Sequence, residues 1–79
     1  MKKSEMQEKF RDLLNRRKAS LKEAKEKGED GVALMNCSEI CGIAASMCII
    51  GLIDWDQKDY IEREAWDIYL GKEPEYEAC

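Results

Sequence analysis

The sequence predicts an all-α fold: one small domain over residues 1–79, built from a long N-terminal helix and a C-terminal helical hairpin. Three observations lead to this prediction. Apolar residues recur at helical spacing in three segments, glycines separate these segments, and the chain contains one proline. With 79 residues, 44% apolar and 38% charged, the chain has room for a single hydrophobic core and no second domain.

The first predicted helix covers residues 4–27. Ser4 and Gln7 have the spacing of a capping box, in which each side chain bonds the backbone of the other. The apolar positions of this segment form one narrow stripe on a charged helix, and they are Met6, Phe10, Leu13, Leu14, Leu21 and Ala24. We expect a turn over residues 28–35, because two glycines and two acidic residues occupy its first four positions.

The second predicted helix covers residues 36–50, with Asn36 as its N-cap and Glu39 as the capping partner. It is apolar on nearly every side, so we expect neighbours to bury it from several directions. The uncharged stretch that contains it runs from Ile40 to Ile53, 14 residues. A bilayer span needs roughly 20, so the sequence predicts a core helix and no membrane contact.

The third predicted helix covers residues 54–70. Gly51 suits the left-handed residue after a helix, and Asp54 with Gln57 forms a second capping box. Gly71 ends the helix, and its predicted core line is Ile61, Ala65 and Ile68. Residues 72–79 form an acidic tail.

The two C-terminal helices resemble short helical hairpins of the SHOCT type, which occur at the ends of many bacterial and phage proteins. The resemblance is carried by the apolar segment Ile40 to Ile50, the Gly51-Leu52-Ile53 turn, and Tyr60 with Ile61 in the acidic second helix. Asp54 stands where that type usually has Thr or Ser. The resemblance implies oligomerisation or partner docking and implies no chemistry.

Charge is divided unevenly along the chain, although the net charge is only −4. Residues 1–27 hold ten Lys or Arg against five Asp or Glu, and residues 28–79 hold three against twelve. One interpretation is that the basic segment packs beside the acidic one and neutralises it. Another is that the two charged surfaces bind partners. The candidate acidic surface comprises Asp56, Asp59, Glu62 and Asp67, and the alternative basic surface comprises Arg16, Arg17, Lys18 and Lys22.

The chain contains no histidine, so the commonest general base and metal ligand is absent. We therefore expect no enzymatic activity, no catalytic residue and no cofactor. Cys37, Cys41 and Cys48 share one helical stripe and are interpreted as buried thiols. Cys37 is expected in the first turn, where the helix dipole would lower the pKa of its thiol. A metal ion held by Cys37 and Cys41 of two copies stays open.

Three short helices of this kind carry more apolar surface than one copy can bury, so we expect a homo-oligomer, in the first instance a dimer. The candidate interface residues are Trp55, Tyr60, Trp66, Tyr69 and Met47. The sequence thus predicts a cytoplasmic, non-enzymatic protein that self-associates and modulates a macromolecular partner, most simply another protein. Its size and charge are typical of phage or mobile-element accessory proteins and inhibitors. The alternative is nucleotide or nucleic-acid binding through the basic first helix.

Overall fold

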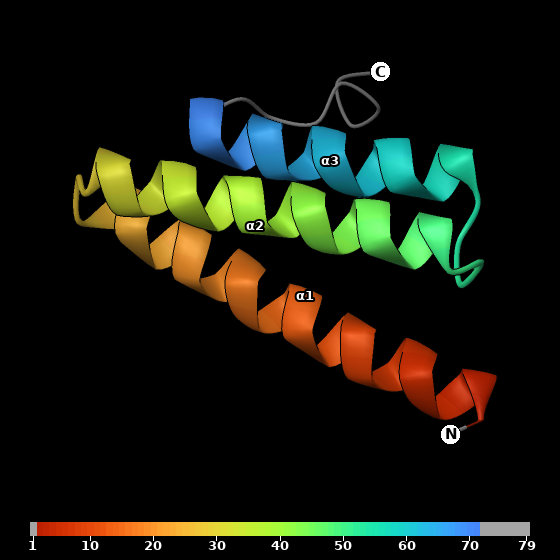
Figure 1. Ribbon diagram of the computed structural model, residues 1–79. Helices are drawn as coiled ribbons and strands as arrows, with labels where there is room; N and C mark the ends of the chain where they lie inside the picture. Colours follow the sequence, from red (N-terminus) through yellow and green to blue (C-terminus); the bar gives the residue numbers. More distant parts are fainter. Residues whose placement is uncertain (1, 72–79) are drawn as a thin grey trace, which may run out of the picture.

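A computed structural model describes residues 2–71, and within this range the chain forms three helices and no strand. They are α1 (Lys3–Glu26), α2 (Asp30–Ile49) and α3 (Trp55–Leu70). α2 lies between the other two, and α1 diverges from it toward the N-terminus (Figure 1). The prediction of an all-α fold with three helices is confirmed. The predicted acidic tail, residues 72–79, lies outside the described residues.

α1 begins one residue earlier than predicted, and its N-cap is Lys2, whose side chain makes no capping hydrogen bond. The predicted capping box at Ser4 is therefore wrong, because Ser4 already lies inside the helix and cannot take the extended conformation of an N-cap. The buried residues of α1 are Leu14, Leu21 and Ala24, all from the predicted stripe.

The link between α1 and α2 is much shorter than the predicted turn over residues 28–35. Gly28 has φ 72°, and the N–H groups of Gly28 and Glu29 donate to the carbonyls of Lys25 and Ala24. This is a Schellman motif, which reverses the chain within two residues. α2 therefore begins at Asp30, six residues before the predicted start. Asn36 is a buried residue inside α2, and its amide donates to the carbonyl of Val32 at 3.1 Å.

The link between α2 and α3 follows the prediction. Gly51 has φ 82°, and the N–H of Leu52 donates to the carbonyl of Met47 at 2.8 Å. The Asp54 carboxylate accepts from the N–H of Gln57 at 2.8 Å, and the Gln57 side chain accepts from the N–H of Asp54 at 3.0 Å. The predicted capping box at Asp54 is confirmed.

The core lies where the three helices meet, and α2 supplies half of its ten buried apolar residues within residues 2–71. Its largest fully buried side chains are Leu21, Ile40 and Cys37. The other buried apolar residues are Leu14, Ala24, Ala33, Ala44, Met47, Leu52 and Ala65. Several of these are alanines, so the helices approach closely and the buried apolar volume of one copy is small.

Replacing Asp54 by alanine removes the carboxylate half of the capping box and leaves the N–H of Gln57, in the first turn of α3, without its partner. We expect the free energy of unfolding to fall by about 1 kcal/mol. Urea denaturation monitored by circular dichroism measures this change. Asp56→Ala is the matched control, because Asp56 is an exposed first-turn carboxylate with no capping hydrogen bond. Equal losses in the two variants would contradict the capping role.

Candidate interaction surface

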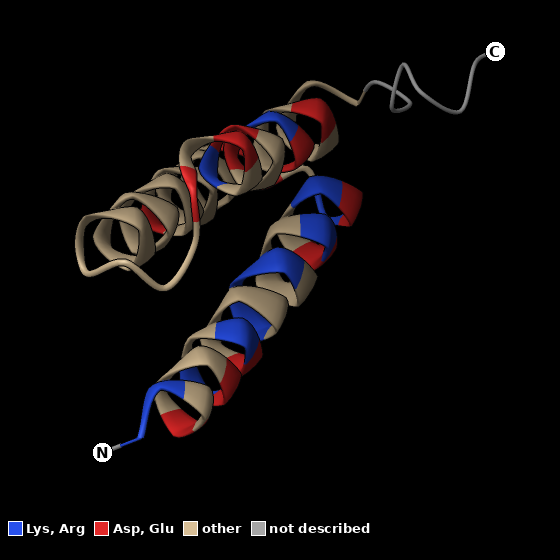
Figure 2. Cartoon of the chain, turned by 90° about the vertical axis from the view of Figure 1, so that its right-hand side faces the viewer, with Lys and Arg blue, Asp and Glu red and all other residues tan. Residues whose placement is uncertain are grey.

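α2 is apolar around its circumference but is covered on one side only. Asp30 and Glu39 are its only two charged residues. The side of α2 away from the core leaves Leu34 43% exposed, Met35 56% exposed and Ile49 83% exposed. Figure 2 shows α2 almost free of charged residues, whereas both other helices carry many. An apolar helix of this kind is normally buried on every side.

α1 and α3 also contact each other, through Lys18 and Glu64, so together they cover the core side of α2 and border its bare side along two edges. Along one edge, Glu39 forms an ion pair with Arg17 of α1, with 2.9 Å between Oε2 and Nε. Along the other edge, the thiol of Cys41 lies beside Glu62 and Trp66 of α3. Between these edges Ser38, Gly42 and Ile49 are exposed, and a Cβ added at Gly42 would meet no atom of the described residues within 4 Å.

Judged by length and composition alone, α2 could also cross a membrane. No other helix among the described residues meets this criterion. Within the bundle, 33% of that segment is buried. The core helix of a soluble protein meets the same criterion, so length and composition are compatible with burial of α2 in either a membrane or a protein interface.

The two tryptophans predicted as interface residues lie on one side of α3 and are both accessible. Trp55 is 70% exposed, and the Lys58 ammonium lies 5.2 Å from its ring centroid. Trp66 is 41% exposed and packs edge-on against Tyr69, with ring centroids 5.7 Å apart. The half-buried Tyr69 ring in turn receives the Lys25 ammonium of α1 at 5.0 Å. Both indoles are therefore available to a partner.

The other two predicted interface residues lie elsewhere. Met47 is only 4% exposed and belongs to the buried apolar cluster of the single chain, so it is a core residue and not an interface residue. Tyr60 is exposed, but it lies on the α1 side of α3, beside Glu64. The structure therefore does not bring these two residues together with the tryptophans.

Three of the four residues of the predicted basic surface are paired with carboxylates. Arg16 bonds Asp12 at 2.5 Å within α1, Arg17 reaches Glu39 of α2, and Lys18 reaches Glu64 of α3. Lys22 is exposed. The two contacts between helices support the interpretation that the basic segment packs against acidic ones, and they leave less positive charge for phosphates.

The predicted acidic surface is partly accessible. Asp56 and Asp59 are exposed, whereas Asp67 is half-buried. Glu62 forms an ion pair with Lys58 one turn earlier, and this contact raises the pKa of the lysine. The freely accessible acidic charge on α3 is therefore concentrated at its N-terminal end.

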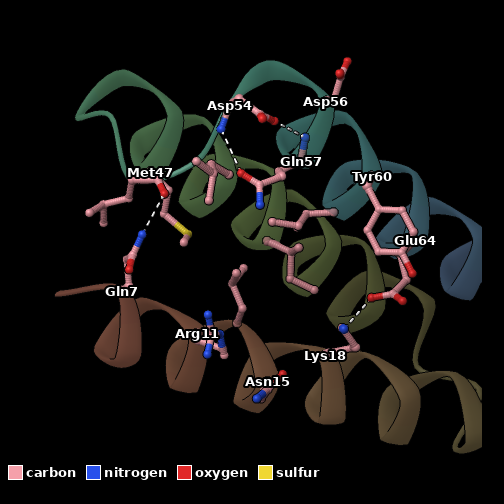
Figure 3. A pocket seen from close by; sticks show the side chains of 15 residues that line it. Gln7, Arg11, Asn15, Lys18, Met47, Asp54, Asp56, Gln57, Tyr60 and Glu64 are labelled. Atoms are coloured by element: carbon pink, nitrogen blue, oxygen red, sulfur yellow. Dashed lines mark hydrogen bonds and ion pairs between the residues drawn. The ribbon is translucent and has the colours of Figure 1, made fainter. Parts of the chain in front are cut away.

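A groove of about 690 Å³ separates the N-terminal half of α1 from the α2–α3 turn (Figure 3). Gln7 crosses it at one end, where its amide donates to the carbonyl of Leu52 at 3.0 Å, and the Lys18–Glu64 ion pair crosses it toward the other end. Arg11 and Asn15 line its α1 wall. This groove could not be predicted from the sequence. It arises from the angle between α1 and α2, and the spacing of apolar residues does not determine that angle.

The prediction that Cys37 lies in the first turn of its helix and has a lowered thiol pKa is wrong. Because α2 begins at Asp30, Cys37 lies two turns inside the helix and not in its first turn. Burial and the neighbouring Cys41 raise the pKa of the Cys37 thiol to about 11, the opposite of the predicted lowering. Cys37 is 0% exposed, so it cannot reach a metal ion shared with a second copy. Within the described residues no group of three or more His, Cys, Asp or Glu could hold a metal ion.

Alkylation by iodoacetamide at pH 8 is expected to modify Cys37 far more slowly than the half-buried Cys48. A thiol with a pKa near 11 forms little thiolate at this pH, and its sulfur is inaccessible. Peptide mass spectrometry over time measures both rates, and denatured protein provides the control in which the difference disappears. Equal rates in the folded protein would show that Cys37 is not buried as described.

No protein-family model, curated protein sequence or solved structure shows a significant match to the chain. The resemblance to the SHOCT type has no family match behind it, and no conclusion rests on it.

Proposed function

We propose that this chain is a non-enzymatic interaction protein of the cytoplasm that self-associates through exposed apolar surface on α2 and α3 and modulates a macromolecular partner. One observation carries the proposal. α2 has the composition of a helix that is buried all round, yet residues 2–71 leave its outer side exposed. Exposed apolar surface of this kind marks sites of association.

The tryptophans of α3 support the same proposal. Large aromatic side chains contribute most of the binding energy where an interface desolvates them. Trp55 and Trp66 lie on one side of α3, and Trp66 adjoins the Cys41 edge of α2. Apolar groups exposed on the two helices therefore lie close enough to contribute to one interface.

The acidic end of α3 supports a role toward a basic partner. Asp56 and Asp59 remain exposed and take no part in the ion pairs between helices. A carboxylate surface of this kind complements the positive groove of a nucleic-acid-processing protein, and such an accessory or inhibitory role suits a small acidic chain.

Light scattering tests self-association. At high micromolar concentration we expect a mass of twice the 9.1 kDa of one chain. Trp66→Ala is expected to weaken association by more than about 1 kcal/mol, since an exposed aromatic anchor is lost. A wild-type mass of one chain at that concentration would contradict the proposal.

Affinity capture from the native host tests the modulated partner. The matched bait is the double variant Asp56→Lys, Asp59→Lys, which keeps α2 intact. Proteins retained by the wild-type chain, lost with the variant and released by salt would support an acidic docking surface. Identical retention by both baits would contradict it.

A further inference from the structure

We propose that the bare side of α2 is covered by α2 of a second copy in parallel orientation, so that α1 of each copy lies over α3 of the other. This inference rests on the proposed self-association and specifies its geometry. It names α2 as the centre of the interface and assigns the tryptophans of α3 to its edge.

The residue spacing on the bare side is that of a helix–helix seam. We define the outer strip of α2 by the residues that follow one another at intervals of four and three, which are Gly31, Met35, Ser38, Gly42, Ala45 and Ile49. An alternation of three and four is the heptad spacing that keeps apolar positions facing a second helix along its length. The strip lies between Glu39, which faces α1, and Cys41, which faces α3.

The sizes of the side chains along the strip also suit a helix as the cover. Met35 and Ile49 are large and exposed near its two ends, and the three positions between them are small. Small residues let two helix backbones approach closely, whereas a bilayer gains nothing from them. Glycine is unfavourable inside a helix, and no atom of the described segment lies within 4 Å of a Cβ built at Gly42. A second helix would occupy that space.

The charges of the flanking helices select the parallel orientation. α1 carries eight Lys or Arg against five Asp or Glu, a net charge of +3. α3 carries two against five, a net charge of −3. Because α1 and α3 border the bare side of α2 along its two different edges, an antiparallel pair of α2 helices would place α1 over α1 and α3 over α3. A parallel pair places each α1 over the oppositely charged α3 of the second copy, which is the electrostatically complementary arrangement.

A twofold axis along the strip pairs every residue with its own counterpart, because both copies use the same surface. The Met35, Ser38 and Ile49 layers would then each contain two copies of one residue. In an antiparallel pair, a residue near one end of the strip would instead meet one near the opposite end, about 16 Å away along α2 for Ser38 and Ile49.

Disulfide trapping distinguishes these arrangements. The full chain is used with Cys41, Cys48 and Cys79 replaced by alanine, and Cys37 is kept because it is buried. Ser38→Cys and Ile49→Cys are introduced separately into this background, and light scattering first establishes the mass of each variant. The variants are then oxidised alone and as an equimolar mixture, and linked species are resolved on non-reducing gels and identified by mass spectrometry.

We expect each variant alone to form a disulfide-linked dimer in most of the protein. In the mixture we expect few disulfides between a cysteine at position 38 and a cysteine at position 49, because these positions lie in different layers of a parallel pair. Linkage only in the mixture would establish an antiparallel pair and overturn the inference while leaving self-association intact. A dimer mass without linkage in any sample would place the interface elsewhere and also overturn it. A single-chain mass for the background and for the wild-type protein would overturn the inference and the proposed function together.

Discussion

Replacing Leu21 by alanine is expected to lower the free energy of unfolding by about 2–5 kcal/mol, the range for truncating a fully buried leucine. Leu21 is 0% exposed and is one of the three largest fully buried side chains. It contacts the core at the level where α1, α2 and α3 still lie close together, so little of the surrounding structure can collapse into the cavity. Small domains have only a few kcal/mol of stability to lose.

Chemical denaturation at matched protein concentrations measures the loss at Leu21. Leu70→Ala is the control, because Leu70 is a leucine in a helix but is 55% exposed, and a change of at most about 0.5 kcal/mol is expected there. If Leu21→Ala were as stable as Leu70→Ala, the packing of α1 against α2 would be wrong.

Ile49→Glu is expected to abolish self-association without unfolding the chain. Ile49 is 83% exposed, so a glutamate there remains solvated in a single copy. In the parallel pair the substitution places two carboxylates opposite each other in an apolar layer, where like charges that lose their hydration repel strongly. The expected result is a single-chain mass at concentrations where the wild-type protein is dimeric, with an unchanged helical circular dichroism spectrum.

Ile50→Glu is the matched control for this substitution. Ile50 is the next residue along the chain and is 50% exposed, but it lies outside the outer strip. The Ile50→Glu variant should therefore retain the dimer mass. Equal loss of association in both variants would show that general exposed hydrophobicity, and not the strip, holds the copies together.

The parts of the fold that sequence analysis located correctly are those controlled by neighbouring residues. The Asp54–Gln57 capping box and the Gly51-Leu52 turn depend on hydrogen bonds within a few residues, and both have the predicted form. The buried positions of α1 follow from one narrow stripe, since a helix with a single apolar face can pack in only one way.

The start of α2 was not predictable in the same manner. The two glycines at 28 and 31 look equivalent in sequence, but only Gly28 takes a positive φ, and Gly31 continues as helix. The Asn36 side chain donates to the carbonyl of Val32, four residues earlier. This bond forms only because the helix has already begun before Asn36. Capping signals at Ser4 and Asn36 were therefore overridden by earlier helix starts.

Sequence patterns indicated the exposure of some candidate interface residues and not of others, for a physical reason. The exposure of Trp55 and Trp66 was foreseen from the excess of apolar residues, whereas the burial of Met47 was not. An apolar helix without a polar side gives no indication of which of its faces neighbours will cover. Only the positions of α1 and α3 decide that Met47 faces inward and that Met35 faces outward.

The central claim is that the outer strip of α2 is covered when copies associate, and the Met35 methyl group reports this most directly. Its NMR signal, recorded with a soluble paramagnetic agent, measures how closely solvent approaches it. We expect protection at high micromolar concentration, progressive loss of protection on dilution, and no protection at any concentration in Ile49→Glu. A Met35 methyl that stays equally accessible across the whole range, as its 56% exposure in the single chain implies, would contradict the claim.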